Sequence, residues 1–552
     1  MINKIKSNDI SSINMEKSMQ QGISFHQKGE LQRAEKLYQR VLQNQPQNAN
    51  AYHLLGIIAY QVGKKNLAID LMNQAIGIDN KQPIFFSNLG NILQEQKRKE
   101  EALQAYQYAV GLNPENEEIQ NDLGNALIEL EHFQQAVYVY HKVIKINPNN
   151  PNVYYNLGNT FRELGQLQQA IDAYDKALTL NPNDAEIYNN LGTALHNLGQ
   201  LHQAERVYNQ AIEKLQGECE KAHYNLGTLQ LLMGDFKTGW QQYQWRWQCD
   251  DFPSENRPFP QPYWKGTSLW GKTILVWAEQ GIGDEIMFAG MLNDLRQSNT
   301  NIMVECEHRL IPLFQRSFPN IQFFGRTNSP DPQLLVPSID YQISMGSLGQ
   351  WLRPDVESFR QNNSYYLTAC PNKTTALRNK YQQLASGKRL VGISWKSTHI
   401  SQRRAKSKST FLKHWIPVLS QPDCYFINLQ YGDTEEELTQ LELDAGLKIY
   451  QDLEIDPLVN LDDFSAQISA LDLVISTSNT TVHMAGSLGK DVWTLLPHIP
   501  DWRWTLEMEE SLWYPKMRLF RQIRIGDWED VFQRVSYSLS AATLDKSSTI
   551  SV

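Results

Sequence analysis

The stretch NLGNTFRELGQLQQAIDAYDKALTLNP, residues 156–182, contains the pattern that decides the fold of the first half of the chain. Within it a glycine at 158 is followed by a small residue at 170, a tyrosine at 174 and a closing proline at 182. The glycine recurs every 34 residues, and once after 35, at Gly22, Gly56, Gly90, Gly124, Gly158, Gly192 and Gly227. A fixed period of this length predicts a stack of similar structural units.

The other repeated positions indicate that each unit is a helical hairpin. A small residue lies twelve positions after the glycine: Ala34, Ala68, Ala102, Ala136, Ala170, Ala204 and finally Gly239. A large one lies sixteen positions after it: Tyr38, Met72, Tyr106, Tyr140, Tyr174, Tyr208 and Tyr243. Small residues let two helices approach closely, and proline ends the second helix. The pattern resembles the tetratricopeptide repeat, in seven copies over about 15–248; a helical array of another kind is the alternative.

Composition restricts the class of protein. A chain of 552 residues is long enough for about three domains. We find no apolar run of the ~18 residues that a membrane span needs, and the N-terminal MINKIKSNDISS lacks the apolar core of a signal peptide. Five scattered cysteines are typical of a reducing compartment, and a net charge of −9 argues against nucleic acid as the main partner. We therefore expect a cytoplasmic protein without a transmembrane segment.

The second half of the chain follows a different pattern. Residues 249–270 are rich in proline and turn residues and are interpreted as a linker. Beyond them, short apolar runs alternate with amphipathic segments: 273–279, 301–307, 321–326, 390–396, 424–431, 471–477 and 491–497. This alternation predicts parallel sheets with helices on both faces. We predict two doubly wound domains, 271–387 and 388–542, between a flexible N-terminus (1–14) and a flexible tail (543–552).

Ligands of parallel sheets bind where strands end and helices begin, so two strand-to-helix turns are the candidate binding segments. The first is QGIGDE, residues 280–285, directly after a predicted strand. Its glycines permit a tight turn and the close approach of a ligand, and Asp284 falls in the first turn of the next helix. Neither a third glycine at the dinucleotide spacing nor a Gly-Lys-Ser/Thr follows. Asp284 is either a functional carboxylate or a simple helix cap.

The second turn is STSNTTVHMAG, residues 476–486, after the predicted strand LDLVIS. Hydroxyl and amide side chains at a helix start, together with free backbone N–H groups, are suited to a diphosphate. Ordinary capping by serine and threonine is the alternative. His483 lies one turn into the helix, where a packed or supporting role is the more usual one.

The two turns together resemble the signature regions of heptosyltransferase-type glycosyltransferases. The similarity is carried by GIGDEIMFAGMLNDL and by LDDFSAQISALDLVISTSNTTVHMAGSLGKDVWTLLP, and it extends over about 271–525. That family has the GT-B fold, in which two Rossmann-like domains flank the active site. The resemblance thus implies an α-solenoid followed by an α/β GT-B fold. The layout is also similar to O-linked N-acetylglucosamine transferases.

The resemblance implies roles for particular residues. The Gly-Asp of the family matches Gly283 and Asp284, and the aspartate is the family's proposed general base. The segment that would hold the diphosphate and sugar of the donor matches the second turn, including Ser478, Asn479, Thr480, Thr481 and His483. The family usually has an aspartate five residues before the histidine, where this chain has Ser478. This departure implies either a different donor or impaired turnover.

A basic segment follows the predicted strand LVGISWK. It contains Lys396, Arg403, Arg404, Lys406, Lys408 and Lys413 without any acidic residue. Cations at the mouth of the cleft can neutralise a leaving nucleoside diphosphate without a metal, and no acidic metal motif lies beside a strand; a solvated loop is the alternative. Gln430, at the end of the strand CYFINLQY, is placed for nucleotide contact. The aromatic residues of PDWRW, 500–504, either stack on a ligand or pack the core, and packing is the more usual role.

A polar ladder accompanies the glycines of the repeats. Two residues before the glycine stand Asn88, Asp122, Asn156, Asn190 and Asn225, and one residue after it stand Asn91, Asn125, Asn159, Thr193 and Thr228. Positions three apart share one helix face, so the ladder can hydrogen-bond an extended peptide. The alternative is that these side chains cap helices or bridge neighbouring repeats.

Together with these observations, the resemblance implies an inverting, metal-independent glycosyltransferase without a cofactor. Asp284 would deprotonate an acceptor hydroxyl, a nucleotide-sugar would be the donor, and the repeats would hold a protein or peptide acceptor. The alternative function is a non-catalytic tetratricopeptide scaffold with a degenerate glycosyltransferase-like domain, and Ser478 is its main support.

Overall fold

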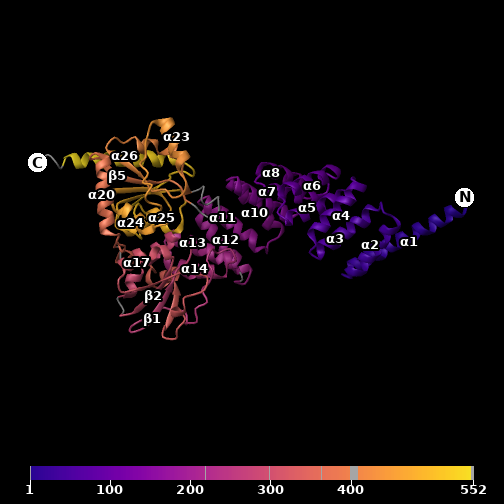
Figure 1. Ribbon diagram of the computed structural model, residues 1–552, viewed down its shortest axis with the longest axis horizontal. Coiled ribbons are helices and arrows are strands. Elements are labelled where there is room, and N and C mark those ends of the chain that lie inside the picture. The colour runs from indigo at the N-terminus through magenta and orange to yellow at the C-terminus, as the bar shows by residue number, and fades with distance from the viewer. Residues whose placement is uncertain (1, 218, 297–298, 362–363, 398–407, 549–552) are drawn as a thin grey trace. The chain divides into compact units, whose positions relative to one another are not determined.

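The computed structural model describes residues 2–217, 219–296, 299–361, 364–397 and 408–548 (Figure 1). The chain forms two compact units, Met1–Leu195 and His196–Val552. The boundary falls in α11 (Ala185–Asn197), so the second unit begins inside the repeat array and includes its last helices. None of the helices in the described ranges combines the length and hydrophobicity that crossing a membrane requires.

The repeats are consecutive antiparallel helix pairs, coloured indigo to magenta in Figure 1. In the first unit the helices are α1 (Ile2–Gln27), α2 (Leu31–Asn44), α3 (Ala49–Gln61), α4 (Lys65–Ile78), α5 (Pro83–Glu95), α6 (Lys99–Leu112), α7 (Glu117–Glu129), α8 (Phe133–Ile146), α9 (Pro151–Glu163) and α10 (Leu167–Leu180), followed by α11. The second unit continues with α12 (Leu201–Lys214), α13 (Glu220–Met233), α14 (Phe236–Tyr243) and the 3-10 turn η1 (Gln244–Gln248).

The recurring glycine is explained by the recurring tyrosine. A Cβ atom at position 124 would lie 2.6 Å from a ring carbon of Tyr140, the large residue of the same repeat. Ala136 and Tyr140 are both completely buried. The glycine and the small residue thus make room for the tyrosine between the paired helices, which confirms the helical hairpin predicted from the spacing.

The first sheet of the second unit has four parallel strands in the order β3-β2-β1-β4. They are β1 (Thr273–Trp277), β2 (Asn301–Cys306), β3 (Gln322–Gly325) and β4 (Tyr341–Ser344). In register, Val276 pairs with Val304 on one side and Ile343 on the other. The nearby helices are α15 (Ile282–Ala289), α16 (Leu292–Arg296), α17 (Ile311–Ser317), α18 (Gly349–Leu352) and α19 (Val356–Gln361), with 3-10 turns η2 (His308–Leu310), η3 (Pro332–Leu334) and η4 (Met345–Leu348).

The second sheet has five parallel strands in the order β6-β5-β7-β8-β9. They are β5 (Arg389–Ser394), β6 (Cys424–Asn428), β7 (Leu473–Thr477), β8 (Val492–Leu496) and β9 (Met517–Arg521). The accompanying helices, orange to yellow in Figure 1, are α20 (Pro371–Ala385), α22 (Ile416–Leu419), α23 (Glu435–Ala445), α24 (Leu461–Ser469), α25 (Thr480–Ser487) and α26 (Trp528–Ser548), with 3-10 turns η5 (Leu412–Trp415) and η6 (Trp502–Trp504).

The two sheets differ in how their faces are covered. Alternate residues of β5 and β7 enter two separate cores, one shared with α24 and α25 and the other with α22 and α26, so helices cover both faces. In the first sheet, Ile274 and Val276 face α15 and α17, whereas Leu275 and Trp277 pack against Phe259 and the partly buried Trp247. Helices therefore cover one face of this sheet, and the segment before β1, which contains Trp247 and Phe259, packs on the other.

The predicted parallel α/β architecture is present in the C-terminal region. Each of the seven apolar runs contains a strand, and β4 and β9 complete the two sheets. Residues 249–270, interpreted from sequence as a linker, pack against the first sheet: the backbone N–H of Trp264 donates to the carbonyl of Gln342 at 2.9 Å. In the same segment Arg257 forms a buried ion pair with Glu305 of β2.

Candidate functional site

The strand orders identify where each sheet can bind a ligand. In a doubly wound sheet the crevice lies at the carboxyl ends of two neighbouring strands whose connections leave in opposite directions. These pairs are β1 and β4 in the first sheet, and β5 and β7 in the second. The turn with Asp284 follows β1, Lys396 follows β5, and the turn with Ser478 follows β7. All three predicted segments therefore lie at switch points.

The two turns meet in the structure. Helices α15 and α25, which begin at Ile282 and Thr480, pack against each other. A Cβ atom at Gly283 would lie 3.1 Å from a ring carbon of His483 and 3.5 Å from Oγ1 of Thr480. Glycine at this position allows the N-terminal end of α15 to approach α25 closely. Residues about 200 positions apart thus form one site.

Asp284 is fixed at the start of α15. Its backbone N–H donates to the carbonyl of Gly281 at 2.9 Å, and its Oδ2 accepts a long, 3.4 Å hydrogen bond from the N–H of the same glycine. The side chain of Asp284 is 17% exposed to solvent. Asp284 therefore has the capping role that the sequence left open, and its carboxylate stays partly exposed.

Arg503 of η6 pairs with the other oxygen of Asp284. Both Nε, at 2.8 Å, and Nη2 of Arg503 donate to Oδ1 of Asp284, and Nη1 donates to Asp501. Lys408 lies 3.4 Å from Asp501. The four side chains form an alternating series of charges from one sheet to the other. Partial burial by itself raises the pKa of Asp501, but the arginine beside it holds that pKa well below its ordinary value.

Hydrogen bonds of the Asn479 and Ser478 side chains hold the second turn against its neighbours. Oδ1 of Asn479 accepts the N–H of Thr481 at 3.0 Å, and its Nδ2 donates to Oγ of Ser394 and the carbonyl of Lys396. Asn479 therefore caps α25 and ties it to β5. Ser478 Oγ accepts the indole N–H of Trp504 at 2.9 Å. Oγ1 of Thr481 is buried without a hydrogen-bond partner in the described part of the chain.

His483 is a packed, neutral side chain. Its Nδ1 lies 2.9 Å from the hydroxyl of Tyr514, and its ring stacks on Trp504 with centroids 5.2 Å apart. Burial is the main cause that lowers the pKa of His483 to about 3. At neutral pH the imidazole is therefore uncharged and supports the turn rather than supplying a cation. Trp502 and Trp504 are also buried, so the aromatic residues of PDWRW pack the core.

Only the two ends of the basic segment, up to residue 397 and from residue 408, lie among the described residues. Lys396 pairs with Glu437 at 2.5 Å, and Lys413 lies over the ring of Phe411. Lys408 belongs to the charge series described above. Arg403, Arg404 and Lys406 lie outside the described residues.

Gln430 is buried, and its side-chain amide holds neighbouring backbone in place. Its Oε1 accepts hydrogen bonds from Oγ of Ser394 and from the backbone N–H groups of Trp395 and Lys396, at 2.7 to 2.9 Å. This amide fixes the carboxyl end of β5. It occupies the predicted place at the strand end, and its oxygen is used within the protein.

The polar ladder bridges neighbouring repeats. Nδ2 of Asn156 donates to Oδ1 of Asn125 at 3.0 Å, and that oxygen also accepts the hydroxyl of Tyr140. Asn190 bonds in the same way to Asn159, which accepts from Tyr174. Nδ2 of Asn88 donates to His53, whose pKa burial lowers to about 4. The bridging alternative is thus present in the structure at these positions.

One ladder position, Asp122, differs from this pattern. Asp122 carries a carboxyl group whose pKa is raised to about 6, first by burial and then by Glu118. A carboxylate cannot donate the bond that an asparagine makes. In the second unit, the carbonyl of Asn225 accepts the hydroxyl of Thr228 at 2.9 Å.

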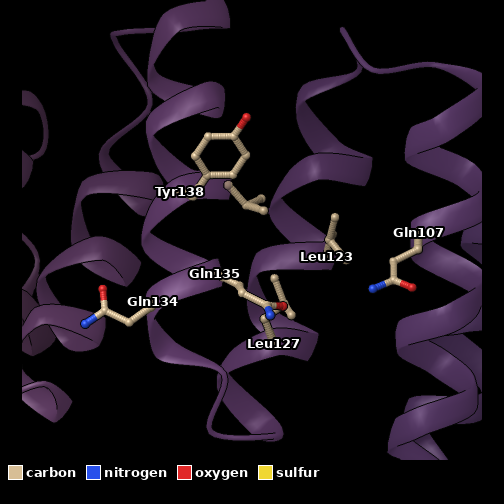
Figure 2. Close-up of a pocket in the computed structure, with 7 residues that line it drawn as sticks. Gln107, Leu123, Leu127, Gln134, Gln135 and Tyr138 are labelled. Carbon is tan, nitrogen blue, oxygen red and sulfur yellow. The ribbon is translucent and has the colours of Figure 1, made fainter.

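Two pockets lie on the repeats of the first unit. One of about 620 Å³ is lined by Asn88 and Asn91 of the ladder together with Tyr60, Glu95 and Glu129. Figure 2 shows the other, of about 400 Å³, between α6, which carries Gln107, and α8, which carries Gln134, Gln135 and Tyr138. Leu123 and Leu127 of α7 lie between them. The repeats of the first unit thus offer hollows lined by both apolar and polar side chains.

Arg503 and Gln280 are the residues that the sequence reasoning missed. Arg503 is the only arginine inside PDWRW, and a charged residue among buried aromatics is a usable signal. Gln280 precedes the first glycine of its turn and has a positive φ of 63°. Within the described ranges, His, Cys, Asp and Glu side chains do not gather in a group that could hold a metal ion.

Comparisons with known proteins agree with the repeat assignment. The chain matches the tetratricopeptide repeat family over residues 19–83, 85–116 and 185–223, and the TPR repeat over 124–161 and 158–199. Protein FlbA of Caulobacter vibrioides is 34% identical over 324 residues, which cover 56% of this chain and 54% of FlbA. The chain thus spans about half the length of this curated relative.

Solved structures similar to the chain cover part of it. YrrB, described as a TPR protein with an unusual peptide-binding site, is 18% identical, with a TM-score of 0.31 over 34% of this chain and 95% of its own. PilF of Pseudomonas aeruginosa is 21% identical, with a TM-score of 0.33 over 38% of this chain and 94% of its own. The family matches by themselves lead to the conclusion that tetratricopeptide repeats are present within residues 19–223 of this chain.

Proposed function

We propose that the chain is a glycosyltransferase that moves a sugar from a nucleotide-sugar to an acceptor hydroxyl. In this proposal the two sheets are the halves of a GT-B fold. The observation that supports it most is the meeting of two switch-point turns, where Gly283 lies against His483 and Thr480. One turn carries an accessible carboxylate, and the other begins a helix whose N-terminal end favours an anion.

The proposed chemistry is a single displacement. Oδ2 of Asp284 takes the proton of the acceptor hydroxyl, and the oxygen attacks the anomeric carbon. The bond from that carbon to the donor phosphate breaks, and its electron pair leaves with the nucleoside diphosphate, so the configuration is inverted. The hydrogen bonds of Arg503 to Oδ1 leave Oδ2 as the base.

Neutralisation of the leaving diphosphate is assigned to the N-terminal end of α25 and to the basic segment after β5. In the structure Lys396 is 40% exposed and pairs with Glu437 at the surface. An exposed pair of this kind is weak and exchanges readily for a stronger anion. The reaction as proposed needs neither a cofactor nor a metal.

The acceptor is proposed to be a protein or peptide held by the repeats. Stacked repeats present extended surfaces that proteins use for binding, and the pocket beside Asn88 and Asn91 supplies hydrogen-bonding groups. We also place the activity in the cytoplasm, since free thiols persist in a reducing compartment. The five cysteines, all among the described residues, are free of disulfide bonds.

The first experiment is a binding screen on the full chain. Uridine, adenosine, guanosine and thymidine diphosphates are added singly, and unfolding is followed by heat. A specific ligand at 100 times its dissociation constant stabilises the folded state by about 2.7 kcal/mol. Transfer from the matching nucleotide-sugar is then measured with Asp284→Asn, which we expect to lose about 10²–10⁴-fold in kcat while it still binds the nucleotide.

Asp501→Asn is the matched control, because it removes the other carboxylate paired with Arg503. It should lose less turnover than Asp284→Asn. Equal turnover in Asp284→Asn and the wild-type chain would remove Asp284 from the mechanism.

A second function, a non-catalytic scaffold, is favoured by one observation. Ser478, where the resembled family has a sugar-binding aspartate, uses its hydroxyl to accept the indole N–H of Trp504. The same screen separates the two functions. Failure of all four diphosphates to stabilise the second unit, together with no transfer, supports the scaffold.

A further inference from the structure

The last repeat is joined to the first sheet by a buried ion pair. Arg246 of η1 donates from Nε and Nη2 to the carboxylate of Glu279, at 2.7 and 2.8 Å. Glu279 lies two residues after the end of β1. Both side chains have no exposure. Nη2 also donates to the hydroxyls of Ser344 and Ser347, and Glu279 accepts the N–H of Gly346. The polar groups brought into this core are therefore matched, which a buried pair requires.

One residue further along, Gln280 contacts three parts of the second unit. Its Nε2 donates to the hydroxyl of Tyr243 in α14 at 2.5 Å, and its Oε1 accepts from Nη2 of Arg503 at 3.2 Å. Its backbone N–H donates to Oγ of Ser254 at 2.6 Å. A glutamine with φ of 63° is held in a sparsely populated conformation, which persists only when the surroundings fix it.

The side chain of Tyr243 is itself immobile. Its ring packs edge-on against Trp240 and Trp502, and the guanidinium of Arg246 lies 4.4 Å from the ring centroid. Burial raises the pKa of the phenol well above its ordinary value, so the hydroxyl stays neutral. It therefore offers Gln280 a fixed hydrogen-bonding partner.

We propose that Tyr243 is a positioning residue for the reaction. The hydroxyl orients the amide of Gln280, the amide oxygen orients Arg503, and Arg503 holds Oδ1 of Asp284. The last repeat is then a part of the catalytic unit, and the turn before Asp284 is complete only with it. The catalytic half of this inference rests on the proposed function; the fixing of the turn does not.

The test uses Tyr243→Phe in the full chain, because phenylalanine keeps the ring packing and removes only the hydroxyl. Tyr38→Phe is the matched control: it is the same repeat position, and its hydroxyl has no hydrogen-bond partner among the described residues. Amide hydrogen exchange of the segment 279–286 is measured first. We expect exchange about 5- to 10-fold faster in Tyr243→Phe and unchanged in Tyr38→Phe.

A double-mutant cycle tests the route through Gln280. Glycine adopts the positive φ without strain, so Gln280→Gly removes the side chain and keeps the turn. If Tyr243 acts through this amide, Tyr243→Phe has no further effect in the Gln280→Gly background. Additive effects would overturn the route.

Turnover gives the catalytic readout. We expect kcat of Tyr243→Phe to fall about 10- to 100-fold with KM for the donor unchanged, since the base is displaced and the donor site is not. Unaltered exchange in 279–286 overturns the proposal whatever the activity. Faster exchange with wild-type kcat overturns the positioning role. A wild-type chain without transfer defeats the proposed function alone, and exchange still decides whether Tyr243 holds the turn.

Discussion

The middle repeats and the last repeat have the same glycine–tyrosine spacing but use the tyrosine hydroxyl differently. In the middle repeats, the hydroxyl of Tyr140 donates to Asn125, the residue after the glycine. In the last repeat, the residue after the glycine is Thr228, and the hydroxyl of Tyr243 accepts from Gln280, outside the repeats. The shared spacing therefore builds the hairpin, while the hydrogen-bond partner of the tyrosine hydroxyl differs from one repeat to another.

Packing inside the hairpins differs in the same way. The middle repeats place alanine, such as Ala136, twelve residues after the glycine, whereas the last repeat has Gly239. A Cβ atom at 239 would lie 2.9 Å from the backbone nitrogen of Leu231. Helices α13 and α14 are thus packed more closely than an alanine would allow, which leaves the bulky Trp240 and Tyr243 to enter the core of the first sheet.

The largest expected effect comes from breaking the buried pair of the last repeat. Arg246→Met leaves Glu279 buried without its partner, which should cost about 3–5 kcal/mol in the free energy of unfolding. All 14 tryptophans lie at position 240 or beyond, so tryptophan fluorescence during denaturation reports on the second unit.

The matched change in a middle repeat is Arg98→Met. Arg98 and Glu101 are 42% and 56% exposed, so the loss of this pair should leave the free energy of unfolding almost unchanged. Circular dichroism of the helices follows this variant, because the first unit has no tryptophan. Similar, small losses for both variants would show that the ion pair does not join the last repeat to the sheet.

Glycine-to-alanine variants should produce a graded series. At Gly227 the added Cβ would lie 2.6 Å from the backbone nitrogen of Tyr243, at Gly124 it meets the ring of Tyr140, and at Gly56 it lies 3.1 Å from the flexible end of Met72. Backbone atoms can move least to relieve such a clash. We therefore expect the free energy of unfolding to fall by about 3 kcal/mol for Gly227→Ala, about 2 kcal/mol for Gly124→Ala and less than about 1 kcal/mol for Gly56→Ala. Peptide-resolved hydrogen exchange in each repeat measures them, and the reverse order would refute the packing argument.

The smallest effect concerns the interrupted ladder. Asp122→Asn should stabilise the first unit by about 0.5–1.5 kcal/mol at pH 7, because an asparagine there can donate to Asn91 as Asn156 donates to Asn125. The folded-state pKa of Asp122, about 6, is above its ordinary 3.8. The cost of the charged form is therefore present above pH 6 and disappears as the pH falls towards 3.8.

Unfolding of both proteins between pH 4 and 7 measures this difference. The advantage of Asp122→Asn should shrink as the pH falls through 6. A constant difference across the range would mean that the charge of Asp122 is not what interrupts the ladder.

Local sequence rules predicted the elements well. The glycine period predicted the helical hairpins, and the apolar runs predicted seven of the described strands. The strand β4 has only four residues, and β9, at a sheet edge, carries an arginine at two of its five positions. Neither has the continuous apolar run of a central parallel strand.

The site was predictable in part. The two turns are identified by sequence because each follows a strand and begins a helix. The Arg503–Asp284 pair joins residues 219 positions apart, and only the packing of η6 against α13 and α15 brings them together. The same is true of Ser478, because no local spacing in the sequence indicates that Trp504 is its hydrogen-bond partner. Contacts that depend on tertiary placement leave no periodic signal in the chain.

The most direct test of this account is native-state hydrogen exchange of the unmodified chain under increasing denaturant. If the last repeat belongs to the catalytic unit, amides of α14 should open together with those of β1, at one free energy. They should not open with the helices of the middle repeats, such as α8. Opening of α14 together with α8 while β1 stays protected would contradict the account.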